Sequence, residues 1–428
     1  MTRMMIADLV SQDSRPIKLK GWIRRIRRTK STTFIVLQDC SGTIQVVADP
    51  ELAKNLELRA DSAVAIAGRA RRDERAPGGL EFDAHELEIL SQAAENLPFS
   101  SASRLDELSP ELAVNYRPLT LRTERGAATF RIEAALAEAF RAALRKRRFT
   151  EIFTSKVVAR ATEGGTNLFA IRYFNRVAYL AQSPQFYKEH GVAGLERVFE
   201  TGHVYRAEPH ASSRHLCEYY SLDFELGFIE DLNEVIELER EVLDEMFAEI
   251  RGRFGKALAL FDAYLPSLGA APVWEFQECL DRLRAAHAPC ARADDLDPPA
   301  ERQLCSLAAK ERGIAAVFVT GFPLKNRPFY THPAADGVNS AGFDLLLRGL
   351  EVTSGGQRLH RRADLQASLR ARGIDSEGFQ THLRMFDLGM PPHGGLAIGL
   401  ERLTCQVLGL RNVREATLYP RDVNRLEP

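Results

Sequence analysis

Hydrophobic and polar residues alternate in short segments between residues 16 and 90. Four segments have this pattern: IKLKGWIRRI, TTFIVLQDCSGTIQVVA, SAVAIAGRARR and GLEFDAHELEIL. Turn residues at Ser41-Gly42 and at Pro77-Gly78-Gly79 separate strands, and a helical insert, PELAKNLELRA, lies between them. Several short strands in under ~100 residues predict a small β-barrel. The insert favours an OB-fold, whose face commonly holds single-stranded nucleic acid.

The pattern changes after the predicted barrel. Residues 93–120 carry scattered Pro, Ser and Asn without a sustained period, which predicts a hinge between domains. Hydrophobic residues then recur every four positions from about 124 to 146, which predicts a long helix with one apolar stripe. The residues of that stripe are Ile132, Leu136, Phe140 and Leu144.

Strands and helices mix in the remainder of the chain. Candidate strands are RVAYLAQ, ERVFETGHVYRAE, CEYYSLDFELGF, AAVFVTGFP, GFDLLLRGLEVTSG and GGLAIGL, and candidate helices cover roughly 231–251, 275–285, 301–311 and 361–371. Hairpin-like neighbours indicate an antiparallel sheet flanked by helices, so we predict an α+β domain. The expected domains are a barrel over 1–92, a hinge over 93–120 and an α+β domain over 121–428.

Composition narrows the class of protein. A chain of 428 residues favours two or three domains, and a formal net charge of −1 gives no overall attraction to nucleic acid, although a local basic patch can still supply it. The six cysteines have no CxxC spacing, so we predict neither a zinc site nor a disulfide framework. The sequence contains no apolar segment of signal-peptide or membrane-spanning length. We therefore expect a cytoplasmic protein that does not contact a membrane.

The stretch VYRAEPHASSRHLCEYYSLDFELGF carries many charges of both signs on a predicted hairpin. Strand alternation places Tyr219, Asp223 and Glu225 on one face, with Arg206 at the end of the preceding strand. An arginine in such a setting favours recognition of a carboxylate or phosphate. The alternative is a solvated surface hairpin whose charges pair with one another.

A second cluster lies in FDLLLRGLEVTSGGQRLHR. Asp344, Glu351 and Ser354 offer hard oxygen ligands, which suit Mg²⁺ held together with substrate phosphates. The alternative is a set of edge-strand ion pairs around a glycine bulge. In HGGLAIGLERL, Arg402 opposes the dipole of a helix N-terminus, which indicates an anionic ligand or simply one unfavourably placed arginine.

Two further segments could read a small polar ligand. Glu163 stands before two glycines in TEGGTNLF and could belong to a mobile flap. Gln185 and Lys188 are one helical turn apart and would share a face, although a plain helix N-terminus explains them equally. In the predicted barrel, basic residues surround Phe34 and Gln45, which suits base stacking plus phosphate contact, or a solvated basic face.

Several of these stretches resemble the motifs of a known family. FETGHVYRAE and RHLCEYYSLDFELGF resemble motif 2 of the class II aminoacyl-tRNA synthetases, and GGLAIGLERL resembles motif 3. TEGGTNLF, QSPQFYKE and GLEVTSGGQRLHR are similar to aspartyl-tRNA synthetases, class IIb, of the archaeal type. The resemblance covers nearly the whole chain and implies a class II synthetase sheet behind an anticodon-binding OB-fold.

The resemblance also implies roles for individual residues. Those expected to bind ATP are Arg206, Glu208, Arg214, His215, Tyr219, Glu351 and Arg402. Those expected to bind aspartate are Glu163, Gln185, Lys188, Arg206, Asp223, Tyr330, Ser354 and Arg358. Those expected to hold Mg²⁺ are Asp344, Glu351 and Ser354. Those expected at the anticodon are Arg24, Arg25, Arg27, Phe34, Gln45 and Pro77. Arg206, Arg402 and Glu351 are the expected catalytic residues.

The implied reaction is activation of L-aspartate by ATP, followed by transfer to tRNA(Asp). The implied assembly is a homodimer built through motif 1, where Ser155 replaces a usual proline. Asparaginyl-tRNA synthetases share these motifs, but two cations, Lys188 and Arg358, favour an aspartate side chain. A non-catalytic RNA-binding paralogue would be expected to lose the motif arginines, which this chain keeps.

The range of tRNAs remains a separate question. Arg24 stands where discriminating relatives often have a bulky aromatic residue, and Pro77 stands where a lysine is often found. These two positions predict a relaxed enzyme that also charges tRNA(Asn). The alternative is an enzyme strictly specific for tRNA(Asp).

Overall fold

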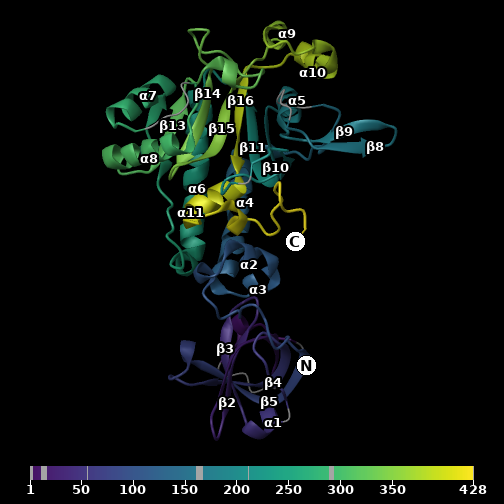
Figure 1. The fold of residues 1–428 in the computed structure, drawn as a ribbon, viewed down its shortest axis with the longest axis vertical. Coiled ribbons are helices and arrows are strands. Elements are labelled where there is room, and N and C mark those ends of the chain that lie inside the picture. Colours follow the sequence, from purple (N-terminus) through teal and green to yellow (C-terminus); the bar gives the residue numbers. More distant parts are fainter. Residues whose placement is uncertain are drawn as a thin grey trace. The chain divides into compact units, whose positions relative to one another are not determined.

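The computed structural model describes residues 3–10, 17–54, 56–160, 167–210, 212–288 and 294–427. The chain forms two compact units, Met1–Ala127 and Ala128–Pro428. They are described one at a time below, and Figure 1 labels their helices and strands. Within the described residues, no helix combines the length and the apolar character needed to cross a membrane.

The first unit contains a closed barrel with the strand order β1-β2-β3-β5-β4. Its elements are β1 (Ile17–Arg28), β2 (Thr33–Gln38), β3 (Thr43–Ala48), α1 (Pro50–Lys54), β4 (Ala63–Arg72) and β5 (Leu80–Ser91). Alternate residues such as Ile35, Val46 and Phe82 fill the barrel core without any exposure. The turn between β2 and β3 forms because Asp39 accepts hydrogen bonds from the backbone N–H groups of Ser41 and Gly42.

The segment that we predicted as a hinge contains two short helices, α2 (Pro110–Asn115) and α3 (Arg117–Thr120). The Ser109 side chain caps α2 by accepting from the Leu112 N–H at 3.2 Å, and Pro110 occupies a first-turn position where no N–H is needed. Helices of four to six residues are too short to show an apolar period, which is why the sequence did not reveal them.

The second unit is built on an eight-stranded sheet with the order β12-β13-β14-β15-β16-β11-β10-β6. Its strands are β6 (Thr150–Glu151), β10 (Arg197–Tyr205), β11 (Glu218–Gly227), β12 (Val273–Glu275), β13 (Ala316–Thr320), β14 (Gly342–Leu347), β15 (Leu350–Arg358) and β16 (His393–Gly399). The five central pairings are antiparallel, as predicted. The edge pairs β12–β13 and β10–β6 are parallel, which the sequence pattern did not indicate.

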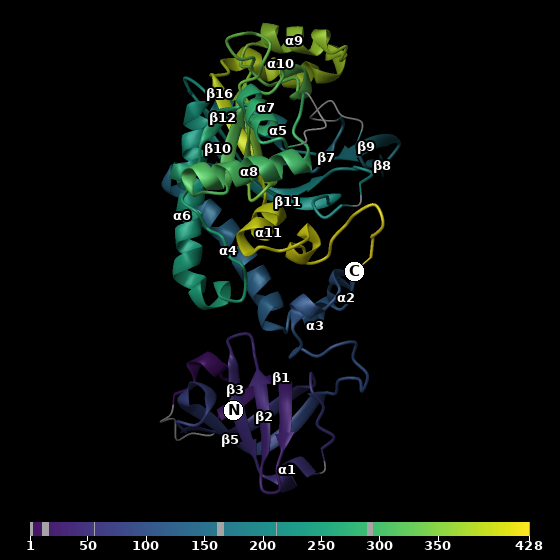
Figure 2. The ribbon, with the colours of Figure 1, turned by 60° about the vertical axis from the view of Figure 1, so that its left-hand side comes forward.

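Helices cover the sheet and its edges (Figures 1 and 2). They are α4 (Glu124–Lys146), α5 (Gln185–Leu195), α6 (Asn233–Leu258), α7 (Phe276–Ala285), α8 (Pro298–Arg312), α9 (Arg362–Ala371), α10 (Gln380–Met385) and α11 (Leu400–Leu408). The main core joins apolar residues of α4 and α6 to one face of the sheet, including Leu222 and Phe224 of β11. Alternation along β11 therefore turns Ser221, Asp223 and Glu225 to the opposite face. A small separate sheet has the order β7-β9-β8, with β7 (Val157–Val158), β8 (Ala170–Tyr173) and β9 (Arg176–Leu180).

Candidate active site

The hairpin of β10 and β11 carries two adjoining polar sites on the sheet face away from α4 and α6. Tyr219 and Ser221 lie toward the start of β11, and Asp223 and Glu225 lie further along it. Gly395 of β16 pairs with Glu225, and a side chain at Gly395 would collide with the Glu225 carboxylate. The glycine therefore makes room for a buried charge at the centre of the sheet.

The first site is an open pocket, called here the nucleotide pocket. It contains every side chain predicted to bind ATP, from the end of β10, the following loop, β11, β15 and the start of α11. Its polar lining residues are Arg206, Glu208, Arg214, His215, Tyr219, Ser221, Glu351, Ser354, Glu401 and Arg402. Arg206 lies 5.7 Å from the Tyr219 ring centre. A flat ligand and a phosphate chain could both find partners in such a set.

The lining of the nucleotide pocket combines three arginines with three glutamates. Arg402 donates hydrogen bonds to the backbone oxygens of Glu351 at 3.1 Å and Arg214 at 3.3 Å, which fixes it at the first turn of α11. Burial and the Arg402 charge lower the pKa of His215, so its imidazole is neutral at pH 7. Arg214 already contacts the buried Glu301 of α8, a partner that the sequence analysis did not identify.

Two of the three predicted metal ligands, Asp344 and Ser354, share one arginine. Asp344 accepts two hydrogen bonds from Arg327, both at 2.8 Å, and Ser354 accepts a third from the same guanidinium at 3.2 Å. Among the described residues, there is no group of three or more His, Cys, Asp or Glu side chains able to hold a metal ion. Arg327 therefore already neutralises Asp344, a partner that the sequence analysis did not identify.

Glu351 is the remaining acidic candidate in the nucleotide pocket. Desolvation raises its pKa to about 7, and the nearby Asp344 charge adds to the effect. Its Oε1 lies 3.7 Å from Nη1 of Arg402. Burial disfavours the ionised form of Glu351, and a bound cation would stabilise it. Glu351 and Ser354 therefore still offer two oxygen ligands beside the place expected for phosphates.

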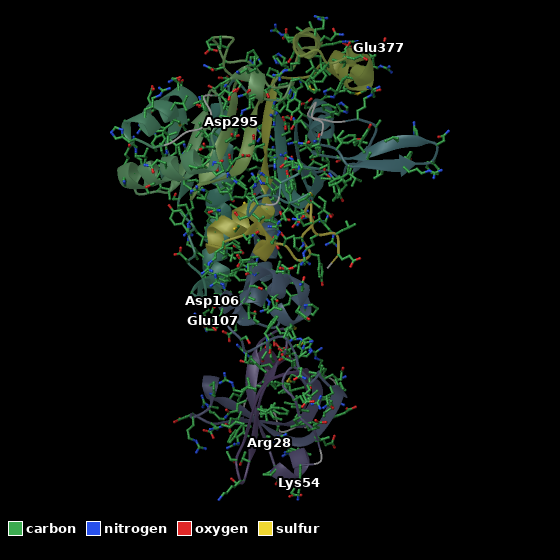
Figure 3. The ribbon with its side chains drawn as sticks, viewed as in Figure 1. Arg28, Lys54, Asp106, Glu107, Asp295 and Glu377 are labelled. Carbon is green, nitrogen blue, oxygen red and sulfur yellow. The ribbon has the colours of Figure 1, made fainter. Side chains whose placement is uncertain are left out.

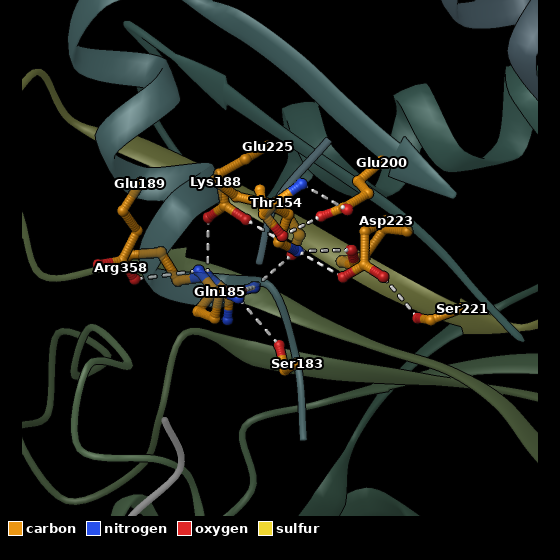
Figure 4. A network of polar contacts seen from close by, with 12 residues as sticks. Thr154, Ser183, Gln185, Lys188, Glu189, Glu200, Ser221, Asp223, Glu225 and Arg358 are labelled. Carbon is orange, nitrogen blue, oxygen red and sulfur yellow. Dashed lines mark hydrogen bonds and ion pairs between the residues drawn. The ribbon is translucent and has the colours of Figure 1, made fainter. Parts of the chain in front are cut away.

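The second site is a cluster of buried side chains, which Figure 4 shows. It contains Gln185, Lys188, Asp223, Glu225 and Arg358, and we call it the amino-acid pocket after the ligand that the sequence predicts for it. Nζ of Lys188 lies 2.9 Å from Oδ1 of Asp223 and 3.3 Å from Oε2 of Glu225, and it donates to the Leu396 backbone oxygen at 3.1 Å. The three charged side chains are at most 1% exposed. The predicted common face of Gln185 and Lys188 is confirmed, because both side chains of α5 are buried in this cluster.

Arg358 closes the other end of the amino-acid pocket. It donates to Glu225 at 2.9 Å, to the Gly395 oxygen at 3.0 Å and to Oε1 of Gln185 at 3.3 Å. Its guanidinium lies 5.4 Å from the ring centre of the buried Tyr330. Burial opposes its charge, but Glu225, Tyr330 and Glu189 together outweigh burial and raise the pKa of Arg358.

Two carboxylates in this region were missed as functional residues. Strand alternation had placed Glu225 on the correct face, but no role was assigned to it. Glu189 follows Gln185 by one helical turn and accepts its amide N–H at 3.0 Å. Lys188 and Arg358 do meet in one pocket, as expected, but both are already paired with Glu225. Glu163 lies outside the described residues.

The barrel brings together most of the predicted anticodon residues. Arg27 pairs with Phe34 across β1 and β2, with its guanidinium 4.5 Å from the ring centre. Val36 of β2 pairs with Arg25 of β1 on one side and with Gln45 of β3 on the other, so Arg25 and Gln45 share the same outer face. Gln45 donates to Glu81 at 2.5 Å, a contact that the sequence did not indicate. Basic character continues to Arg28 at the end of β1, which is labelled in Figure 3.

Two predicted anticodon residues lie apart from that face. Arg24 occupies an irregularity in the β1–β2 register and forms an ion pair with Glu124 at 2.7 Å. Pro77 begins the 3-10 turn Pro77–Gly79 between β4 and β5. A bulge shifts the β1–β2 register between Ile23 and Arg25, so strict alternation does not hold at Arg24.

Comparisons with known proteins agree with this geometry. Residues 109–423 match the family of class II tRNA synthetases (D, K and N), and residues 17–90 match the OB-fold nucleic acid binding domain. The aspartate–tRNA(Asp/Asn) ligase of Thermus thermophilus is 43% identical over 434 residues, covering both chains completely. That of Deinococcus radiodurans is 40% identical, covering 100% of this chain and 99% of its own.

Solved structures match over the whole chain as well. The asparaginyl-tRNA synthetase of Pyrococcus horikoshii, complexed with asparaginyl-adenylate, superposes with a TM-score of 0.92 at 29% identity, with complete coverage of both chains. An aspartyl-tRNA synthetase structure from Leishmania major gives 0.88 at 26% identity, covering 100% of this chain and 95% of its own. With its family matches and its full-length relatives, the chain belongs to the aspartate–tRNA ligase family of class II aminoacyl-tRNA synthetases.

Proposed function

We propose that this protein activates L-aspartate with ATP and transfers it to the 3′ end of tRNA(Asp) and tRNA(Asn). The observation that carries the proposal is the junction of two pockets on one strand. Tyr219 of β11 lines the nucleotide pocket, and Asp223 of the same strand lies in the amino-acid pocket. A nucleotide and an amino acid bound there would meet near Arg206.

The first step joins the two substrates. An oxygen of the aspartate α-carboxylate attacks the α-phosphorus of ATP, forming aspartyl-adenylate, and pyrophosphate leaves. Arg206 bridges the reacting carboxylate and phosphate, while Tyr219 and Arg402 hold the adenine between them. Catalysis of this kind needs positioning and charge neutralisation rather than a protein nucleophile. A terminal ribose hydroxyl of the tRNA then attacks the carbonyl carbon, and AMP leaves.

The remaining residues of the nucleotide pocket orient ATP. Glu208 faces the adenine, and Arg214 and His215 meet the β- and γ-phosphates. Arg214 contacts Glu301 before any ligand binds, so phosphate binding requires this arginine to share or exchange partners. His215 serves as a neutral hydrogen-bond donor, because its pKa is lowered by burial and by Arg402.

The amino-acid pocket selects aspartate by charge. Lys188 and Arg358 bind the side-chain carboxylate, and Gln185, Asp223 and Glu163 bind the α-ammonium group. Tyr330 packs on Arg358 and limits the pocket. The pocket's cations are buried, so an uncharged side chain would gain less from them than a carboxylate does.

Mg²⁺ fits this site with two of the three predicted protein ligands. Glu351 and Ser354 would hold it together with the phosphates of ATP, and Asp344 would contribute through the charge of its Arg327 pair rather than as a ligand. When bound, the ion neutralises phosphate charge. The two protein oxygens suffice, because Mg²⁺ usually keeps several waters and substrate oxygens.

The barrel is proposed to read the anticodon. Phe34 and Gln45 contact the central base, with Arg25 and Arg27 at the backbone, while Arg24 and Pro77 influence the discriminating base. The relaxed range rests on the last two residues and on relatives from Thermus and Deinococcus whose names include both tRNAs. The strict alternative also has a relative, the aspartate–tRNA(Asp) ligase of Picrophilus torridus, at 38% identity.

The assembly and domain limits are part of the same proposal. We assign anticodon binding to residues 1–92, a hinge to 93–120 and catalysis to 121–428, in a cytoplasmic homodimer. Exposed apolar side chains support a dimer, because Phe153 is 85% exposed and Leu418 and Tyr419 are also exposed. Light scattering of the purified protein should give a mass of about twice 47.8 kDa.

Aminoacylation tests the function directly. Labelled aspartate and labelled asparagine would each be offered with purified tRNA(Asp) and tRNA(Asn). We expect aspartate on both tRNAs and asparagine on neither. Aspartate on tRNA(Asp) alone would establish the strict alternative, and asparagine on tRNA(Asn) would contradict the amino-acid assignment.

A further inference from the structure

A buried polar chain leads away from the amino-acid pocket, between α5 and α10. It begins at Gln185, whose Nε2 donates to Oε1 of Glu189 at 3.0 Å. The other oxygen of Glu189 lies 3.2 Å from Nε2 of His382. Nδ1 of His382 lies 2.9 Å from Nε2 of His190, at the half-buried outer end of the chain. The nucleotide and amino-acid contacts described above do not use these histidines.

The surroundings of this chain are apolar. His382 stacks on the Phe186 ring with centres 4.0 Å apart, and Phe386 packs against its edge at 5.1 Å. Glu189 is fully buried. A charge in such a place is strongly unfavourable unless hydrogen bonds compensate it. Burial raises the pKa of Glu189, but His382, His393 and Gln185 together outweigh burial and lower this pKa to about 2.

An ionised Glu189 dictates how the Gln185 amide is oriented. A carboxylate only accepts hydrogen bonds, so it must face the Nε2 of Gln185 rather than the oxygen. The amide oxygen is thereby turned to the other side, where it accepts from Arg358 at 3.3 Å. An acceptor is the atom type that a substrate ammonium group requires.

His190 contacts the other ring nitrogen of His382. Burial, with the His382 charge, lowers the pKa of His190 to about 4, so His190 is neutral at pH 7. Because a carboxylate only accepts hydrogen bonds, Nε2 of His382, which faces Glu189, is the ring nitrogen that must carry a proton. Glu189, Arg358 and His393 are the other charged or titratable groups near this pair.

We propose that Glu189, His382 and His190 are positioning residues that hold the Gln185 amide with its oxygen toward the amino-acid pocket. The inference rests on the proposed function, because it assigns Gln185 to the ammonium group of aspartate. According to this proposal, His190 of α5 and His382 of α10 determine the affinity for the amino acid without contacting it.

Two variants of His382 separate hydrogen bonding from packing. His382→Phe keeps the ring but removes the donor, and His382→Gln keeps an N–H that can reach Glu189. In aspartate-dependent ATP–pyrophosphate exchange, we expect His382→Phe to raise the KM for aspartate about ten-fold, with the KM for ATP unchanged. His382→Gln should restore most of the loss.

Phe386→Leu is the matched packing control, because Phe386 touches the same imidazole without bonding to the chain. It should lower the melting temperature and leave the KM for aspartate unchanged. Should His382→Phe not fold, His190→Leu tests the same chain from its outer end, with an expected rise in KM of about three-fold.

The outcomes are separable. An unchanged KM for aspartate in folded His382→Phe or His190→Leu, or an equal rise in the KM for ATP, would overturn this inference alone. Absence of aspartate-dependent exchange in the unaltered protein would overturn the proposed function, and this inference with it.

Discussion

The nucleotide pocket and the amino-acid pocket share β11, but their charged side chains differ in depth and in pairing distance. The side chains of Arg206 and Arg402 keep 36% and 27% exposure, and carboxylate oxygens of Glu208 and Glu351 lie 3.9 and 3.7 Å from them. Lys188 is 1% exposed and lies 2.9 Å from Asp223. Arg206 and Arg402 of the first pocket lie closer to solvent, so losing one of them should cost little stability, whereas the second pocket is held by its own buried ion pairs before a ligand binds.

This difference predicts how substitutions behave. A change in the nucleotide pocket should affect activity and leave the free energy of unfolding nearly unchanged. A change in the amino-acid pocket should affect both, because it leaves a buried charge without its partner.

The largest effect is expected from Lys188→Met. It removes the cation shared by Asp223 and Glu225, so aspartate-dependent exchange should fall more than about 1,000-fold and the free energy of unfolding by about 3–5 kcal/mol. Exchange assays and urea denaturation measure the two effects. The double variant Lys188→Met/Glu225→Gln should regain stability but not exchange. Near-normal exchange in the single variant would contradict the pocket assignment.

Arg402→Ala tests the nucleotide pocket. Loss of a stacking and phosphate-binding group should raise the KM for ATP about 100-fold. Urea denaturation should give an unchanged free energy of unfolding, and the KM for aspartate should stay within about three-fold. Arg411→Ala, which changes an exposed arginine beyond the end of α11, is the control. A large loss of stability in Arg402→Ala would remove the contrast between the pockets.

Phe34→Ala tests whether the barrel works apart from both pockets. Loss of one stacking ring should lower tRNA charging about ten-fold. Adenylate formation, measured as pyrophosphate exchange, should be unaffected. Phe34→Tyr keeps the ring and should charge tRNA normally. Equal losses of charging and exchange in Phe34→Ala would show that the two functions are not separable.

The smallest effect on activity is expected for Glu239, a buried carboxyl on α6, behind the sheet. Desolvation raises its pKa to about 8, and Thr353 and Arg240 only partly oppose this. The folded state therefore keeps a proton that the unfolded state loses above its ordinary pKa of about 4.3, and stability falls with rising pH by at most about 1.4 kcal/mol per unit up to pH 8. Glu239→Gln removes that slope.

Urea denaturation between pH 5 and pH 8 checks this sign. The Glu239→Gln variant should exceed the parent protein in stability at pH 8, and the difference should shrink toward pH 5. Parallel stability profiles for the two proteins would show that Glu239 is ionised when folded.

Much of the fold could be predicted from local sequence patterns. The four-residue apolar period predicted α4 over 124–146, which the structure confirms at both ends. Alternation along β11 separated Leu222 and Phe224 from Asp223 and Glu225, so the polar face was known before its surroundings. The residues predicted to bind ATP lie in contiguous motifs, and all of them line the nucleotide pocket, whereas Ser221 and Glu401 of the same lining were not predicted.

Contacts between segments that are far apart in the sequence could not be predicted from local patterns. Arg327 reaches Asp344 from a loop with no distinctive pattern, so the partner of this predicted metal ligand could not be foreseen. Glu301 of α8 meets Arg214, and His382 of α10 meets Glu189 of α5, through packing that no local period encodes. The sequence identified the charged residues that the two pockets bring together, but not the buried partners that already neutralise several of them.

The central claim is that the buried ion-paired pocket selects a carboxylate side chain. ATP–pyrophosphate exchange by the unaltered protein, with aspartate and asparagine compared at equal concentrations, tests it most directly. We predict a kcat/KM for aspartate at least about 100-fold above that for asparagine. Equal values, or a preference for asparagine, would contradict the claim that Lys188 and Arg358 act as the partners of a substrate carboxylate.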